Sequence, residues 1–155
     1  MNIPLTKSSL ALEGFLREFG PSLERALVAR FGYEVGREAA ADATAYACEH
    51  WSRLATMGNP VGYLFRVGQS AARRQHRWQR PLVLRHDPVT VDTALDLDLQ
   101  RALMRLKPEQ RVAVLLTCGF GCTHNEVAAL LGTSTSNVSN HVSRGLTRLR
   151  RYVQP

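Results

Sequence analysis

Long apolar runs are missing from this chain of 155 residues. No segment approaches the roughly 20 apolar residues that a membrane-spanning helix needs. The first residues, MNIPLTKSSLALEG, have no apolar run behind a basic head, so we expect no signal peptide. Cysteine is scarce, and three cysteines at wide spacing do not indicate a disulfide framework. These absences predict a cytoplasmic protein with no membrane as a partner.

Acidic residues are missing from long parts of the chain. Lys and Arg number 20 against 13 Asp and Glu, a net charge of +7. Five arginines lie between Arg73 and Arg85 with no acid, four aspartates between Asp87 and Asp98 with no base, and no acid follows Glu126. A basic protein suits a polyanionic partner, with nucleic acid ahead of a membrane surface. The alternative is that the charge only keeps the chain soluble.

Helical periodicity on both sides of the acidic segment predicts an all-α fold of two small lobes. The segment between them, RPLVLRHDPVTVDTALDLD, contains two prolines and shows no sustained helical period before about Thr93. We therefore predict a three-helix bundle at residues 1–79, a flexible acidic linker at residues 80–95, and a four-helix lobe at residues 96–155.

The first two helices are expected before residue 55. Apolar residues at helical spacing predict the first over residues 12–31, kinked or interrupted at Gly20-Pro21. The second runs over residues 35–54, and we expect the break at Gly58 and Asn59 to end it.

The third helix has two contrasting sides. Asn59 can cap it, and Pro60 suits its first position. The packing side comprises Val61, Leu64, Phe65, Gly68, Ala71 and Ala72. The opposite side is a basic stripe that comprises Tyr63, Arg66, Ser70, Arg73, Arg74 and Arg77. Such a stripe suits a nucleic-acid backbone, with Tyr63 or Trp78 available to stack on a base. A solvated arginine face is the alternative.

The stretch TCGFGCTHNE, residues 117–126, resembles the start of a metal site. A closed zinc site needs four ligands, whereas Cys118, Cys122 and His124 supply at most three in an unusual spacing. Thr123 and Glu126 stand at the spacing of a capping box, in which each side chain bonds the backbone amide of the other residue. We therefore interpret the stretch as a helix boundary and expect no metal.

The second lobe is expected to hold four helices. LDLQRALMRLKPEQRVAVLL predicts two, divided at Lys107-Pro108 with the proline at the start of the second. A short helix follows Thr123 and ends at Gly132, and Ser134 can cap the last helix. A short helix, a turn with glycine and a longer helix form a helix-turn-helix.

The last helix is expected to pack through Val138, Val142, Leu146 and Leu149. Its other side would enter a DNA major groove, with predicted base contacts from Ser136, Asn137, Ser139, Asn140, Ser143 and Arg144. Asn137 and Asn140 are plausible readers of adenine, since one amide can bond N6 and N7 together. Predicted phosphate contacts, which position the helix without specifying sequence, are Arg148, Arg150 and Arg151. A purely structural helical hairpin is the alternative.

Catalytic motifs are missing as well. The chain has no Gly-rich phosphate loop, nucleophile elbow or H-E-x-x-H. Asp42, Glu49 and His50 share one predicted helix and raise the hypothesis of a hydrolase, but such scattered groups are usually surface residues. We therefore expect no enzymatic activity and no cofactor.

The second lobe is similar to region 4 of small bacterial sigma factors of the extracytoplasmic-function type. The string LMRLKPEQRVAVLLTCGFGCTHNEVAALLGTSTSNVSNHVSRGLTRLR matches that family's L-x-x-L-x-P-x-x-R, G-x-[ST]-x-x-E-[IV]-A-x-x-L-G and S-x-x-x-V patterns in order. Residues 8–78 resemble region 2. The family's Asp-x-x-Gln-Glu signature is present only as Asp42, because Ala45 and Tyr46 replace the Gln and Glu.

The resemblance implies a promoter-specificity factor that binds core RNA polymerase and directs initiation at promoters with specific −10 and −35 elements. It implies that region 4 binds the −35 element through the last helix and that region 4 also binds the β flap. It implies −10 binding and melting by Asn59, Tyr63, Arg66, Ser70, Arg73, Arg74 and Arg77. It implies docking on the β′ clamp helices by Asp42, Ala45, Tyr46 and Glu49. An anti-sigma factor is a further candidate partner.

An autonomous helix-turn-helix regulator is the alternative function. The output domains of response regulators share the G-x-[ST]-x-x-E-[IV]-A and N-H-V-S-R patterns. The basic third helix argues against this alternative, because the first lobe of a regulator is more often a sensor.

Overall fold

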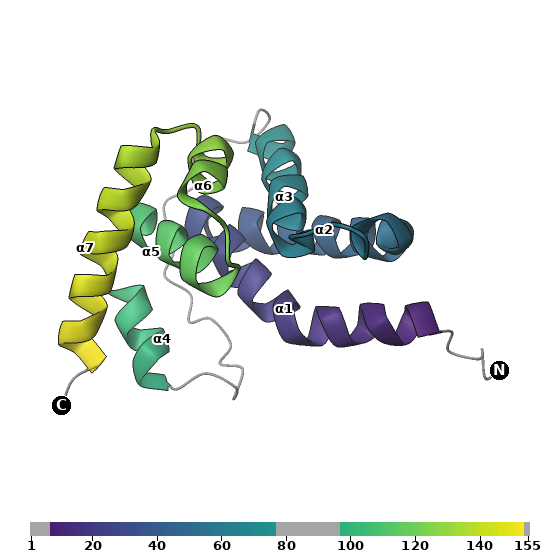
Figure 1. The fold of residues 1–155 in the computed structure, drawn as a ribbon, viewed down its shortest axis with the longest axis horizontal. Coiled ribbons are helices and arrows are strands. Elements are labelled where there is room, and N and C mark those ends of the chain that lie inside the picture. The colour runs from purple at the N-terminus through teal and green to yellow at the C-terminus, as the bar shows by residue number, and fades with distance from the viewer. Residues whose placement is uncertain (1–6, 77–96, 154–155) are drawn as a thin grey trace. The chain divides into compact units, whose positions relative to one another are not determined.

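The computed structural model describes residues 7–76 and 97–153, which are mostly helical and contain no strand (Figure 1). This confirms the predicted all-α fold. The chain divides into two compact units, Met1–Arg85 and His86–Pro155. The predicted linker at residues 80–95 lies outside the described residues, as do Arg77 and Trp78.

The first unit is a bundle of three helices. They are α1 (Lys7–Phe31), α2 (Tyr33–Leu54) and α3 (Pro60–His76). Gly32 alone joins α1 to α2, with a φ of 89° that favours glycine. After this turn α2 runs back along α1, and α3 crosses them (Figure 1).

Two details of these helices differ from the sequence predictions. We predicted a kink or an interruption at Gly20-Pro21, and the interruption does not occur, because Pro21 lies inside the continuous helix α1. The burial of Leu23, Ala26 and Leu27 just after the proline gives α1 packing that offsets the lost hydrogen bond. The predicted end of the second helix at residue 54 is confirmed, since α2 ends at Leu54, but the non-helical residue at His50 inside α2 was not predicted.

Small residues let the three helices approach closely. A Cβ added at Gly36 of α2 would collide with the backbone of Val28 in α1, and one at Gly68 of α3 would lie 2.6 Å from Leu27 Cδ1. The predicted packing side of α3 is confirmed, since all six of its residues are buried: Val61, Leu64, Phe65, Gly68, Ala71 and Ala72.

The described part of the second unit, residues 97–153, contains four α-helices, as predicted. They are α4 (Leu97–Met104), α5 (Pro108–Val114) with a π-helical continuation η1 (Leu115–Gly119), α6 (His124–Leu131) and α7 (Thr135–Val153). The long helix α7 packs against α4, α5 and α6 (Figure 1). No described helix is both long and apolar enough to cross a membrane.

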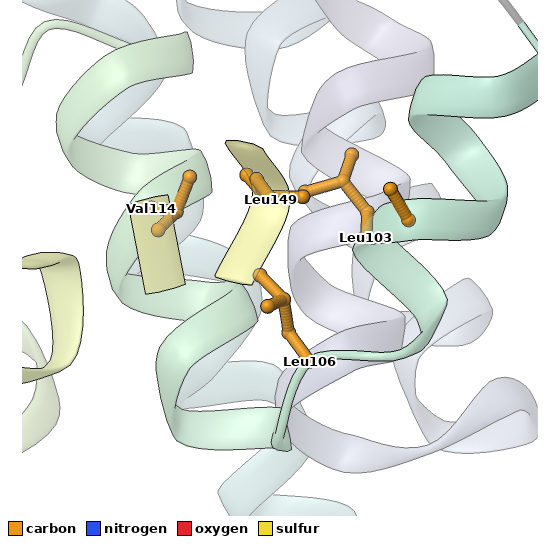
Figure 2. Close-up of a cluster of buried hydrophobic side chains, with 5 residues drawn as sticks. Leu103, Leu106, Val114 and Leu149 are labelled. Carbon is orange, nitrogen blue, oxygen red and sulfur yellow. The ribbon is translucent and has the colours of Figure 1, made fainter. Parts of the chain in front are cut away.

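One cluster of buried side chains joins α4, α5 and α7. Figure 2 shows Leu103 and Leu106 converging with Val114 of α5 and Leu149 of α7. Gly145 brings α7 close to α5, since a Cβ there would lie 2.7 Å from Val114 Cγ2. This cluster fixes which side of α7 is turned inward.

Arg111 closes the corner between α4 and α5. The last carbonyls of a helix lack partners within the helix, and the Arg111 guanidinium donates to the backbone oxygens of Leu103 at 2.8 Å, Met104 at 2.9 Å and Leu106 at 3.0 Å. Burial lowers the pKa of Arg111, but arginine remains charged at neutral pH.

Replacing Arg111 with methionine removes all three hydrogen bonds while keeping a long apolar side chain. We expect a loss of about 1.5–3 kcal/mol in the free energy of unfolding, because the bonds involve a charged donor. Urea denaturation followed by circular dichroism measures it. Arg101→Met is the control: Arg101 makes only an exposed pair with Asp98 at 4.0 Å, so the change should stay within about 0.5 kcal/mol. Equal effects of the two substitutions would contradict the role of Arg111.

Candidate nucleic-acid interface

A capping box begins α6, as the sequence predicts. The amide of Glu126 donates to Thr123 Oγ1 at 3.1 Å, and the amide of Thr123 donates to Glu126 Oε2 at 2.8 Å. Gly121 just before it has a φ of 66°, and Cys122 is buried. The interpretation of this stretch as a helix boundary is confirmed.

The two cysteines of the stretch lie in different environments. Cys118 is exposed and Cys122 is buried, and both are free thiols. Within residues 7–76 and 97–153, no group of three or more His, Cys, Asp or Glu could hold a metal ion.

The turn between α6 and α7 is shaped by one glycine and one cap. Gly132 ends α6 in the left-handed region, with a φ of 65°. Ser134 Oγ accepts from the amide of Asn137 at 3.1 Å. This is the predicted cap of α7, and it satisfies an amide that the helix itself leaves open.

Two further hydrogen bonds brace the turn. Thr135 Oγ1 donates to Asn125 Oδ1 at 2.7 Å and links the start of α7 to α6. Asn137 Nδ2 donates to Thr133 Oγ1 at 2.9 Å, which fixes the orientation of the Asn137 amide. Neither bond was predicted from the sequence.

The two sides of α7 differ sharply in burial. Val138, Val142, Gly145 and Leu149 are buried. All six predicted base-contacting residues are exposed, namely Ser136, Asn137, Ser139, Asn140, Ser143 and Arg144. Of the predicted phosphate contacts, Arg150 and Arg151 are exposed and Arg148 is half-buried. The unit thus presents a polar, acid-free helix side.

In the first unit, α3 presents the predicted basic stripe as far as the structure describes it. Asn59 Oδ1 accepts from the amide of Gly62 at 3.0 Å and caps the helix. The exposed residues of the stripe are Arg66, Ser70, Arg73 and Arg74, while Tyr63 is half-buried. Because α3 buries its other side, the stripe faces outward.

Tyr63 is held by two side chains of α2, a feature that no local spacing predicts. Its hydroxyl lies 3.3 Å from that of Tyr46 and accepts from Arg53 Nη2 at 3.0 Å. The Arg53 guanidinium also lies 5.7 Å from the centre of the Tyr63 ring. The hydrogen bond between the hydroxyls lowers the pKa of Tyr63 and raises the pKa of Tyr46.

The four residues predicted to dock on the polymerase divide into two groups. Asp42, Ala45 and Glu49 are exposed on α2, while Tyr46 is half-buried with its hydroxyl against Tyr63. The Tyr46 ring also lies beside that of His50, with ring centres 4.3 Å apart and the planes tilted by 42°.

The fold and these surfaces define an all-α protein of two units, the second of which is a helix-turn-helix domain. Comparison with known families is more specific. Residues 96–149 match the family described as Sigma-70, region 4.

A relative supports the extracytoplasmic-function type. Over 62 residues the chain is 40% identical to the ECF RNA polymerase sigma factor SigE of Mycolicibacterium smegmatis. The match covers 40% of this chain and 24% of that relative's length. The sequence-based resemblance to such sigma factors is thereby confirmed.

One solved structure extends the likeness of fold to 92% of the chain. The sigma factor RpoE of Bartonella quintana, solved with the anti-sigma factor NepR, matches with a TM-score of 0.57 and 21% identity, over 92% of this chain and 96% of that one. CnrH, solved with the cytosolic domain of CnrY, matches with a TM-score of 0.48 and 22% identity, over 92% of this chain and 86% of that one.

The hydroxyl pair predicts a titration effect. Tyr46→Phe removes the donor that stabilises the Tyr63 phenolate, so the pKa of Tyr63 should rise toward the ordinary tyrosine value, although Arg53 and Arg66 still lower it. NMR of tyrosine labelled at the hydroxyl-bearing carbon measures the titration. Tyr33→Phe is the control, because Tyr33 bonds Arg37 instead. An unchanged Tyr63 titration in Tyr46→Phe would show that the two hydroxyls do not bond in solution.

Proposed function

We propose that this chain is a promoter-specificity factor of the extracytoplasmic-function type, which binds core RNA polymerase and directs initiation at promoters with specific −10 and −35 elements. The observation that carries the proposal is the presence of two outward helix sides suited to nucleic acid: the basic stripe of α3 in one unit and the polar side of α7 in a region 4 domain. The polymerase supplies the chemistry, and the factor works in the cytoplasm.

The α7 side suits readout of a −35 element in the major groove. Within the described part of the chain, the Asn140 amide makes no hydrogen bond, whereas one donor of Asn137 is engaged by Thr133. Asn140 therefore keeps both its donor and its acceptor for one adenine, and Asn137 is pre-oriented for a single contact. Arg148, Arg150 and Arg151 lie toward the end of the helix and suit phosphates.

The α3 stripe suits the −10 element. Exposed arginines at Arg66, Arg73 and Arg74 attract phosphates without regard to sequence. Ser70 lies among them and adds a hydroxyl. Arg77, also assigned to this surface, lies outside the described residues.

The α2 side opposite the core suits docking on the polymerase. Asp42, Ala45 and Glu49 follow one another at helical spacing and are exposed. We assign this side to the β′ clamp helices and the region 4 unit to the β flap. An anti-sigma factor is a further proposed partner, supported by the partner solved with RpoE.

Transcription of sheared genomic DNA by purified core polymerase, with and without this chain, tests the proposal when RNA 5′ ends are sequenced. New starts that share paired −35 and −10 motifs are the expected result. If no new starts arise and the chain alone protects a duplex operator, the autonomous regulator replaces the proposal. A chain that neither starts transcription nor binds duplex DNA would contradict both functions.

Asn140→Ala should relax base preference at one −35 position. A good bidentate contact contributes about 1–3 kcal/mol of discrimination, so preference there should fall by roughly five- to 150-fold while affinity for core polymerase is retained. Selection from randomised −35 sequences measures it. Thr147→Ala is the control, since the Thr147 hydroxyl is engaged by the backbone oxygen of Ser143 at 2.9 Å. An Asn140→Ala chain with the parent's preference at every position would remove Asn140 from the readout.

Replacing Arg73 and Arg74 together with alanine should weaken open-complex formation at every promoter. An arginine that no longer neutralises a phosphate reduces the salt slope of binding by about 1. The measurement is permanganate reactivity of the opened strands across a salt series. Arg17 and Arg30 replaced together form the control, because they remove equal charge from α1. If control and test variants reduce opening equally, general charge rather than the stripe is responsible.

A further inference from the structure

Tyr46 lies on the proposed docking side of α2, and its surroundings differ from those of the residues beside it. Ala45 and Glu49 are exposed on α2. The Tyr46 hydroxyl instead reaches Tyr63 of α3, 17 residues further along the chain. The ring centres of the two tyrosines lie 6.0 Å apart. Tyr46 therefore joins α2 to α3.

Arg53 completes this contact from the last turn of α2. It donates to the Tyr63 hydroxyl at 3.0 Å, so one hydroxyl meets two side chains of α2. The segment between Arg53 and Tyr63 includes the loop of residues 55–59, which connects α2 to α3. The bond between Arg53 and Tyr63 thus joins the helices on the two sides of this loop.

Local hydrogen bonds already shape both ends of the loop. Thr56 Oγ1 donates to the backbone oxygen of Arg53 at 2.7 Å. The amide of Met57 donates to the backbone oxygen of Leu54 at 3.0 Å. At the other end, Asn59 caps α3. None of these bonds crosses from α2 to α3. The contact of Tyr63 with Tyr46 and Arg53 does so, and it links the helices on either side of the loop.

We propose that Tyr46, Arg53 and Tyr63 are positioning residues that hold the α2–α3 loop and the first turn of α3 for promoter opening. This inference rests on the proposed function. The stripe of α3 begins at Tyr63, and the docking side of α2 includes Ala45 and Glu49, next to Tyr46. The three side chains therefore link the helix that meets the polymerase to the helix that meets the DNA.

Hydrogen exchange in the free full-length chain tests the positioning role. Tyr63→Phe keeps the ring and removes the hydroxyl with both of its hydrogen bonds, so loop amides should exchange at least roughly two- to tenfold faster, which is the effect of a single modest hydrogen bond. Arg53→Met should act in the same direction. The control is Tyr33→Phe: Arg37 donates to the Tyr33 hydroxyl at 2.9 Å and lies 5.3 Å from its ring centre, but both residues belong to α2. Unchanged loop exchange in Tyr63→Phe would overturn the proposal.

Promoter opening by each chain with core polymerase tests the link to function. Tyr46→Phe and Tyr63→Phe should each reduce the open-complex equilibrium roughly two- to tenfold, and Arg53→Met should do so with the parent's affinity for core. The double variant Tyr46→Phe/Tyr63→Phe should match Tyr63→Phe alone, since that single change already removes both bonds; multiplied effects would mean independent roles.

The outcomes separate this inference from the proposed function. Faster loop exchange with normal opening would overturn the link between the three residues and the promoter. If the parent chain itself opens no promoter, the proposed function fails, and the exchange rates alone then support or overturn the positioning role. Melting temperatures equal to the parent's should accompany the expected result and exclude global unfolding.

Discussion

One guanidinium at the end of α4 holds together the part of the second unit on which its surface depends. Arg111 binds three backbone carbonyls there, so α4 stops and α5 begins at a fixed angle. With that corner set, Leu103 and Leu106 face Val114 and Leu149 (Figure 2). The long helix α7 packs against this cluster, so its opposite side is exposed to solvent.

The helix starts were predictable because each depends on residues within one turn. Asn59, Thr123 and Ser134 all bond an amide three residues later, so a pattern of neighbours suffices to find them. Pro108 marks the start of α5 by a local restriction of its own backbone. The inward side of α3 follows from helical periodicity. These local rules placed the helix-turn-helix and the outward position of its predicted base-contacting residues.

Other features depend on contacts between distant residues, and no local rule finds them. Pro21 stays inside α1 because the residues just after it are buried in the bundle. The non-helical residue His50 has no neighbouring proline or glycine from which the sequence could predict it. The bond between Tyr46 and Tyr63 joins two helices across a loop. The roles of the exposed residues are a separate matter, because exposure and charge permit a contact with DNA or polymerase without establishing it.

Tyr46 shows how one residue on an exposed helix side can also connect two helices. Ala45 and Glu49 beside it are exposed on α2, whereas the Tyr46 hydroxyl contacts that of Tyr63 on α3. The outward residues of α7 offer the complementary case: they share no position with the buried ones. A substitution on the outward side of α7 therefore requires no change in the core, so this surface can vary one residue at a time while the folding of the unit remains intact.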